Sequence, residues 1–86
     1  MRTVVLNTRR LQNKQTAHGY LQRRLRLPGY YGHNLDALYD VLTSVGDKTR
    51  ILILHPQKAE DHARRILDTI LEAGEKNENL EVKSLG

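Results

Sequence analysis

Two aspartates and a tyrosine stand at helical spacing in the middle of the chain, and their side chains are the ones best suited to chemistry. Asp36 and Asp40 are four positions apart, and Tyr39 precedes the second aspartate. Paired carboxylates can act as general acid and base, or they can bind a cationic partner. On adjacent turns of one helix they would project from a convex surface, whereas enzyme sites are concave. The pattern therefore favours a binding surface over a catalytic site.

The helix that carries these side chains is expected to begin after Asn34, because asparagine is a favoured N-cap residue. At about 100° per residue, Asp36 and Asp40 fall opposite a stripe of apolar residues, with Tyr39 at its margin. Two acids at this spacing destabilise a helix by about 0.2–0.5 kcal/mol, so the face is either an ordinary solvated one or a binding surface. The apolar stripe consists of Leu35, Leu38, Val41, Leu42 and Val45.

Three segments with strand character alternate with helical stretches. They are residues 4–6, 51–54 and 80–85, and the order of elements is β-α-α-β-α-β, typical of a parallel α/β domain. Residues 51–54 are apolar throughout and are expected at the centre, whereas residues 80–85 alternate as at an edge. Right-handed crossovers then give strand order 1-2-3 with all helices on one face. We predict one two-layer α/β domain over residues 1–86.

Two further helices follow from apolar spacing. The first is predicted from residue 15 or 16 to residue 26, because Pro28 disfavours helical geometry in the residue before it. A later helix is predicted to end near Gly74, since glycine often follows the last helical turn. Their inward-facing residues are Ala17, Tyr20, Leu21 and Leu25 in the first and Ala59, Ala63, Ile66, Leu67, Ile70 and Leu71 in the later one.

Composition limits the class of protein. The chain has 86 residues, 38% hydrophobic and 28% charged, which describes one small globular domain rather than a disordered segment. The absence of cysteine excludes disulfides, thiol nucleophiles and Cys-ligated zinc. The longest aliphatic runs are far shorter than the ~20 residues of a membrane helix, and no signal peptide is recognised. We expect a mature cytoplasmic protein.

Charge is distributed unevenly. Residues 1–28 hold seven basic side chains and no acid, whereas residues 29–86 carry seven basic and ten acidic side chains. Such asymmetry indicates a charged partner. The alternative is a nucleic-acid-binding module or an orphan protein-interaction module that uses the basic first helix. Against nucleic acid, Tyr30, Tyr31 and Tyr39, which could stack on bases, stand beside acids that repel RNA. A solvated basic helix is the preferred interpretation, and a homo-oligomer formed through opposite charges stays open.

The four histidines show no short ligand spacing. His18, His33, His55 and His62 are far apart in the sequence and are interpreted as isolated surface or loop side chains. We therefore expect no metal site and no cofactor.

Residues 25–43, LRLPGYYGHNLDALYDVLT, resemble the barstar family of intracellular inhibitors of a secreted bacterial ribonuclease. The resemblance reaches back without a gap to residues 4–7 and is weaker after residue 45. It implies the same three-stranded parallel fold. It also implies that carboxylates of the second helix occupy places in the ribonuclease active site where RNA phosphates would bind, so no catalytic residue is needed.

The resemblance assigns the contacts residue by residue. Asp40 matches the central phosphate mimic, Glu72 matches a peripheral acidic contact, and Tyr31 is left as a packing residue beside Tyr30. The expected partner is an extracellular or toxin-type ribonuclease, the protein is expected to be a monomer, and direct binding of nucleic acid or membrane is not expected. The predicted partner-binding residues are Tyr30, Asp36, Tyr39, Asp40, Thr43, Ser44 and Glu72.

Overall fold

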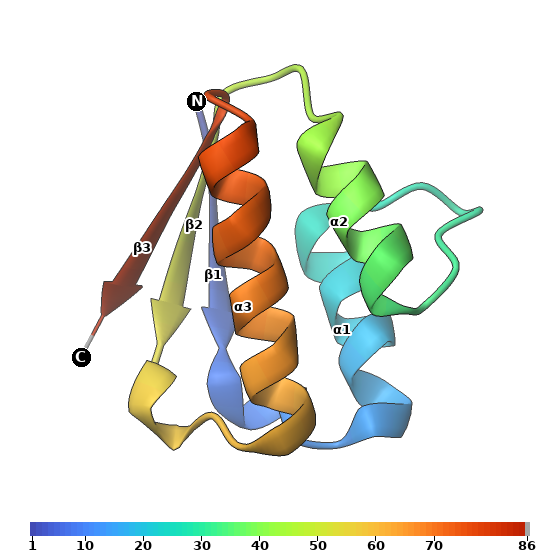
Figure 1. Ribbon diagram of the computed structural model, residues 1–86, viewed down its shortest axis with the longest axis vertical. Coiled ribbons are helices and arrows are strands. Elements are labelled where there is room, and N and C mark those ends of the chain that lie inside the picture. Colours follow the sequence, from blue (N-terminus) through green and yellow to red (C-terminus); the bar gives the residue numbers. More distant parts are fainter. Residues whose placement is uncertain (86) are drawn as a thin grey trace.

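A parallel sheet of three strands carries all the helices on one face (Figure 1). The computed structural model describes residues 1–85. The strand order is β1-β2-β3, with β2 at the centre, so the fold class, the strand order and the central strand predicted from the sequence are confirmed. The elements are β1 (Arg2–Asn7), the short 3-10 helix η1 (Thr8–Leu11), α1 (Lys14–Leu25), α2 (Leu35–Thr43), β2 (Thr49–Leu54), the 3-10 helix η2 (Pro56–Lys58), α3 (Asp61–Lys76) and β3 (Leu80–Leu85).

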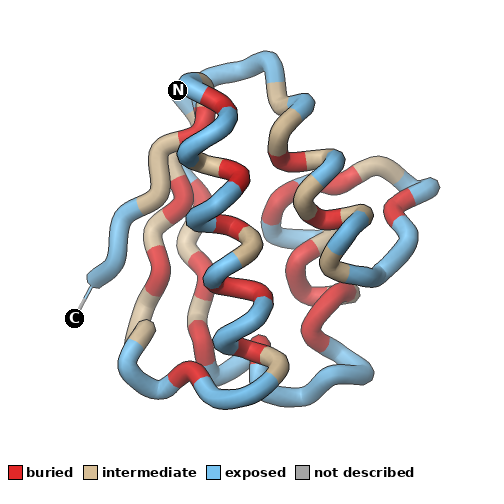
Figure 2. The backbone as a smooth tube through the Cα atoms, in the orientation of Figure 1, coloured by how far each residue is buried: buried red, intermediate tan, exposed pale blue. Residues whose placement is uncertain are grey.

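The core lies between the sheet and the three helices. Alternate residues of β1 and β2 are buried, as a sheet with one covered face requires, and Figure 2 shows buried and less buried positions alternating along these strands. The outer face of β2 is only half-buried, at Leu52 and Leu54. Fully enclosed core side chains include Leu6, Leu21, Leu38, Leu42, Ile51, Ile53, Ile66 and Ile70.

Helix α1 covers the free edge of β1. As an edge strand, β1 has backbone groups that no neighbouring strand can pair. The Asn7 N–H donates to the Tyr20 hydroxyl at 2.9 Å, and the Arg24 guanidinium donates two hydrogen bonds to the Val5 carbonyl at 3.1 and 3.2 Å. These bonds fix α1 against the strand. They also give Arg24, one of the seven basic side chains of residues 1–28, a structural role.

The N-terminus of α1 lies slightly earlier than expected. It begins at Lys14, where the Asn13 side chain accepts the Gln15 N–H at 2.9 Å, and it ends at Leu25. Arg26, the predicted last residue, is instead the C-cap, in a left-handed conformation with φ of 54°. Such a residue commonly ends a helix.

Helix α3 continues through Gly74 to Lys76, so the end predicted for it was wrong. A Cβ atom at Gly74 would lie 3.0 Å from Cγ2 of Val82, in β3. This glycine therefore allows α3 to lie close against the strand rather than ending the helix. Even α3, the longest helix among residues 1–85 with 16 residues, is not long and apolar enough to cross a membrane.

Candidate functional site: an acidic groove between two helices

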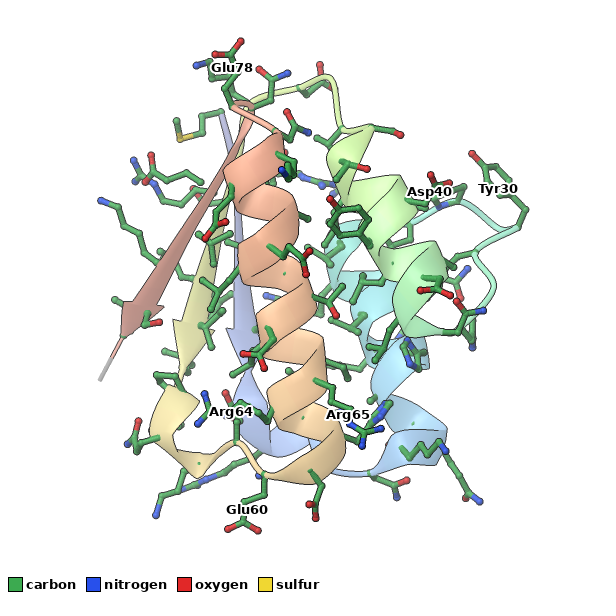
Figure 3. All side chains as sticks on the ribbon, in the orientation of Figure 1. Tyr30, Asp40, Glu60, Arg64, Arg65 and Glu78 are labelled. Atoms are coloured by element: carbon green, nitrogen blue, oxygen red, sulfur yellow. The ribbon has the colours of Figure 1, made fainter. Side chains whose placement is uncertain are left out.

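Helix α2 begins and packs as its sequence predicts. The Asn34 side chain accepts the Ala37 N–H at 2.7 Å, which satisfies a backbone donor of the first turn. Leu38 and Leu42 are buried in the core, where α2 packs on α3, and the acids of α2 are exposed on the opposite side. The outward position of Asp40 on α2 can be followed in Figure 3. The buried leucines thus fix the orientation of α2, so that its carboxylates face outward.

The C-terminal end of α2 is tied to α3. Asn77, the C-cap of α3, is buried and donates from Nδ2 to the Leu42 and Val45 carbonyls at 3.0 and 2.9 Å. Thr43 and Ser44 use their hydroxyls locally, because both donate to the Asp40 carbonyl, at 3.0 and 2.9 Å. These two predicted contact residues therefore lie at the end of the helix with their hydroxyl protons already engaged.

The acids of α2 and α3 line a common groove of about 380 Å³, which we call the acidic groove. Packing of α3 against α2 brings Glu72 to the same hollow as Asp36 and Asp40, although it is far from them in the sequence. Leu35 and Thr69 complete the groove and were not among the predicted site residues. Thr69 could have been found from its spacing of three to Glu72 on one helical face. The full lining is Leu35, Asp36, Tyr39, Asp40, Thr69 and Glu72.

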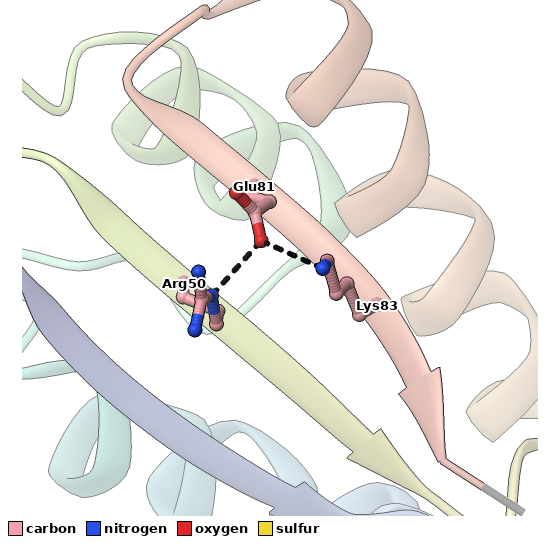
Figure 4. A network of polar contacts seen from close by, with 3 residues as sticks. All are labelled: Arg50, Glu81 and Lys83. Carbon is pink, nitrogen blue, oxygen red and sulfur yellow. Dashed lines mark hydrogen bonds and ion pairs between the residues drawn. The ribbon is translucent and has the colours of Figure 1, made fainter.

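No cation among residues 1–85 forms an ion pair with the carboxylates of the acidic groove. The ion pairs in this part of the chain join Glu81 to Arg50 at 2.9 Å and to Lys83 at 3.5 Å (Figure 4). Both pairs lie on the sheet, away from the helices. The three carboxylates of the groove are therefore left available to cations of another molecule.

The two tyrosines of the α1–α2 loop have different environments. Tyr30 is 86% exposed and projects from the far end of the loop (Figure 3), whereas Tyr31 is 5% exposed. Burial raises the pKa of Tyr31 to about 12. Its hydroxyl lies 2.5 Å from Nδ1 of His18. The burial of Tyr31 confirms that it is a packing residue, and Tyr30 is left exposed in the position predicted for a contact.

Three of the four histidines lie together, so their interpretation as isolated side chains was wrong. The ring centres of His18 and His62 are 5.3 Å apart, and those of His18 and His33 are 6.2 Å apart. Burial, followed by the neighbouring His62 and His33, lowers the pKa of His18. Sequence spacing could not reveal this cluster, because its members come from α1, the following loop and α3. Within residues 1–85, no group of three or more His, Asp or Glu side chains is placed to hold a metal ion.

The arginines of the N-terminal segment lie elsewhere. A separate groove of about 240 Å³ beside β1 is lined by Arg2, Thr3, Val4, Arg23, Arg24 and Arg26, and it shares no residue with the acidic groove. Arg10 stacks on Tyr20, with its guanidinium carbon 4.9 Å from the ring centre. The arginine-lined groove and the acidic groove are therefore distinct surfaces.

Fold and site together define a small parallel α/β domain whose helices present an acidic groove. The family model described as Barstar (barnase inhibitor) matches residues 1–83. The chain is also 35% identical to the protein named "Putative ribonuclease inhibitor YrdF" of Bacillus subtilis (strain 168), over 87% of this chain and 88% of that protein. The chain therefore belongs to the barstar family. The matched region includes the C-terminal half, in which the resemblance seen from the sequence is weaker.

Proposed function

We propose that this protein is an inhibitor of a ribonuclease and that the acidic groove, together with Tyr30, is its contact surface. The observation that carries the proposal is the uncompensated group of three carboxylates, held by two packed helices, in a member of the barstar family. A ribonuclease concentrates Arg, Lys and His in its active site to hold a phosphodiester. Carboxylates on a rigid support can meet those cations with charge-assisted hydrogen bonds.

Within this surface, Asp40 is the proposed centre. It is exposed in the middle of α2, opposite Leu38 and Leu42, where its carboxylate has no evident structural use. Asp36 lies in the first turn, so its charge also complements the helix dipole. Glu72 would extend the contact onto α3.

Tyr30 supplies the apolar part of the proposed contact. An exposed tyrosine can bury a large area at low entropic cost, and tyrosine is enriched at the centres of interfaces. The buried Tyr31 beside it holds the loop. Tyr39, which is half-buried at the margin of the groove, would pack between the acidic contacts, and Thr43 and Ser44 would contact the partner through their outer atoms.

The proposed mechanism is blockage of the ribonuclease active site rather than a chemical reaction. The carboxylates would occupy the positions of RNA phosphates, so the inhibitor would exclude substrate without a catalytic group of its own. The proposed target is an extracellular or toxin-type bacterial ribonuclease, and the proposed setting is the cytoplasm, where such an enzyme would otherwise degrade RNA.

The test is inhibition of RNA cleavage by a panel of secreted bacterial ribonucleases. The parent chain should inhibit at least one enzyme at about equimolar ratio. A variant with Asp36→Asn, Asp40→Asn and Glu72→Gln should lose inhibition. The matched control carries Asp47→Asn, Asp68→Asn and Glu75→Gln, the same change of charge at three exposed acids outside the groove, and should still inhibit. Failure of the parent against the whole panel, or equally weakened inhibition in both variants, would contradict the proposal.

A further inference from the structure

A second hollow lies where the three helices begin, beside the acidic groove. Its volume is about 520 Å³, and it borders the acidic groove at Leu35 and Asp36, which line both. We call it the histidine cleft. Figure 3 shows Arg65 at the beginning of α3, on the side that faces α1. The cleft is lined by Lys14, His18, His33, Asn34, Leu35, Asp36, His62 and Arg65.

The charge of the histidine cleft is mainly positive. Lys14 and Arg65 are exposed, and neither forms an ion pair within the described part of the chain. Burial comes first among the causes that lower the pKa of His62, and the charges of Lys14 and Arg65 come next. Their positive potential therefore reaches the imidazole. Asp36 is the one acid of the lining, at the border shared with the acidic groove.

The imidazoles add hydrogen-bonding groups to these two cations. Because the pKa of Tyr31 is raised to about 12, its hydroxyl stays protonated at neutral pH and can donate to Nδ1 of His18. When Nδ1 of a neutral imidazole accepts, Nε2 carries the hydrogen, so His18 keeps an Nε2–H donor. Nε2 of His62 is buried and has no hydrogen-bond partner among residues 1–85. Buried polar atoms normally have a partner, and His62 lines the cleft, so this nitrogen is one polar group there that no partner within the described residues occupies.

We propose that the histidine cleft binds an oxyanion of the phosphate class, with Lys14 and Arg65 supplying charge and His18 and His62 supplying hydrogen bonds. His33 also lines the cleft, but its Nε2 already donates to the Gln22 side-chain oxygen at 2.9 Å. A phosphate group offers several acceptor oxygens and a charge of about −1.5 to −2 at neutral pH, which matches two cations and a set of imidazole N–H donors. Among the described residues, the histidines are not placed to hold a metal ion. The beginnings of α1, α2 and α3 add the positive ends of their dipoles on the same side.

Binding in the histidine cleft should depend on pH. An anion beside the imidazoles favours their protonated form, so at a fixed charge on the anion binding should be tighter at about pH 6 than at about pH 8. The charged and titratable groups that face the imidazoles are Lys14 on α1, Tyr31 in the loop, Asp36 on α2 and Arg65 on α3. The proposal does not require that the protein inhibits a ribonuclease, so either can fail without the other.

The experiment is a calorimetric titration with inorganic phosphate at constant ionic strength, with chloride as the reference salt. The parent should show saturable binding, and Lys14→Gln and Arg65→Gln should each weaken it by about tenfold. Arg64→Gln is the matched control, because Arg64 is exposed on the same helix but does not line the cleft, and it should change affinity less than about twofold. All three changes are at exposed positions, so folding is preserved.

A second arm compares adenosine monophosphate with adenosine and identifies the source of the anion. Binding of the nucleotide and of inorganic phosphate, with no binding of adenosine, would show that the phosphate group is what the cleft recognises. Much tighter binding of the nucleotide would identify a nucleotide as the source, and equal affinities would favour free phosphate. The proposal is overturned if no saturable binding is seen up to about 10 mM phosphate, if Arg64→Gln weakens it as much as Arg65→Gln, or if adenosine binds equally well.

Discussion

The Tyr31 hydroxyl and Nδ1 of His18 are 2.5 Å apart in the buried space between α1 and the loop that precedes α2. This bond joins the loop to the helix on which it packs. Tyr30, one residue earlier, is almost fully exposed to solvent. The position of the exposed tyrosine therefore depends on the buried one.

Replacing the two tyrosines should separate stability from binding. Tyr31→Ala should lower the free energy of unfolding by about 3–5 kcal/mol, because it removes a large core side chain. Tyr30→Ala should change it by less than about 0.5 kcal/mol, since its ring is exposed, while weakening ribonuclease inhibition. Urea unfolding and inhibition assays on both variants measure these effects. Equal destabilisation of the two variants would refute the division of roles.

Asp40→Ala tests the centre of the acidic groove. Removing one of two exposed acids at a spacing of four should leave stability unchanged or slightly higher. Inhibition should weaken by at least about 2 kcal/mol, or about 30-fold, the size expected of a central interface residue. Inhibition constants and melting temperatures provide the two readouts. Asp68→Ala, at an exposed position of α3 outside the groove, is the control; if it weakens inhibition as much, the effect is one of net charge alone.

The histidine cluster predicts loss of stability in mild acid. Burial lowers the pKa of His18 and of His62 below the ordinary value of 6.5, so the unfolded chain takes up protons at a higher pH than the folded protein. The free energy of unfolding should therefore fall as the pH drops below about 6.5, and it should be nearly constant above that.

Urea unfolding in phosphate-free buffers between about pH 5 and pH 8 would measure this dependence. His62→Asn should reduce the slope, whereas His55→Asn, outside the cluster, should preserve it. A protein whose stability is the same at both ends of this range would contradict the assignment of lowered pKa values.

The arginines of α1 distinguish the proposed inhibitor from a nucleic-acid-binding module. Arg23→Gln and Arg26→Gln should leave inhibition unchanged or improve it, because both remove positive charge that repels a basic enzyme. The parent should show little retention of mixed RNA in filter binding at physiological salt. Tight retention that falls in these variants, with a salt dependence shallower by about one unit for each arginine–phosphate pair removed, would instead favour RNA as the ligand.

Features that depend on local periodicity were predictable from the sequence. The strand order and the acidic face of α2 follow from short-range patterns, and Leu38 and Leu42 are buried as their spacing requires. The place of Glu72 could be predicted only by resemblance, because its approach to α2 depends on how two helices pack. No local pattern shows that Gly74 faces Val82, which is why the end of α3 was misplaced.

The histidine cluster could not be predicted for the same reason. Its three rings meet only after α1, the loop and α3 have packed, and each histidine alone has the sequence context of a surface residue. The hydroxyls of Thr43 and Ser44 are a smaller case. Both were predicted to contact a partner, but the last turn of a helix leaves carbonyls free, and these two side chains donate to carbonyls of α2.

The cover that Tyr20 and Arg24 give to β1 bears on how the protein behaves at high concentration. An open strand edge is a template on which a second chain can add its own strand, and this is a common route to aggregation. Here one of the two edges has some of its hydrogen-bonding groups already occupied by side chains of α1. The other edge of the sheet is β3, which α1 does not cover. There the charges of Glu81 and Lys83 disfavour close approach of an apolar strand. A protein proposed to bind one enzyme molecule would benefit from sheet edges that do not bind a second copy of the protein.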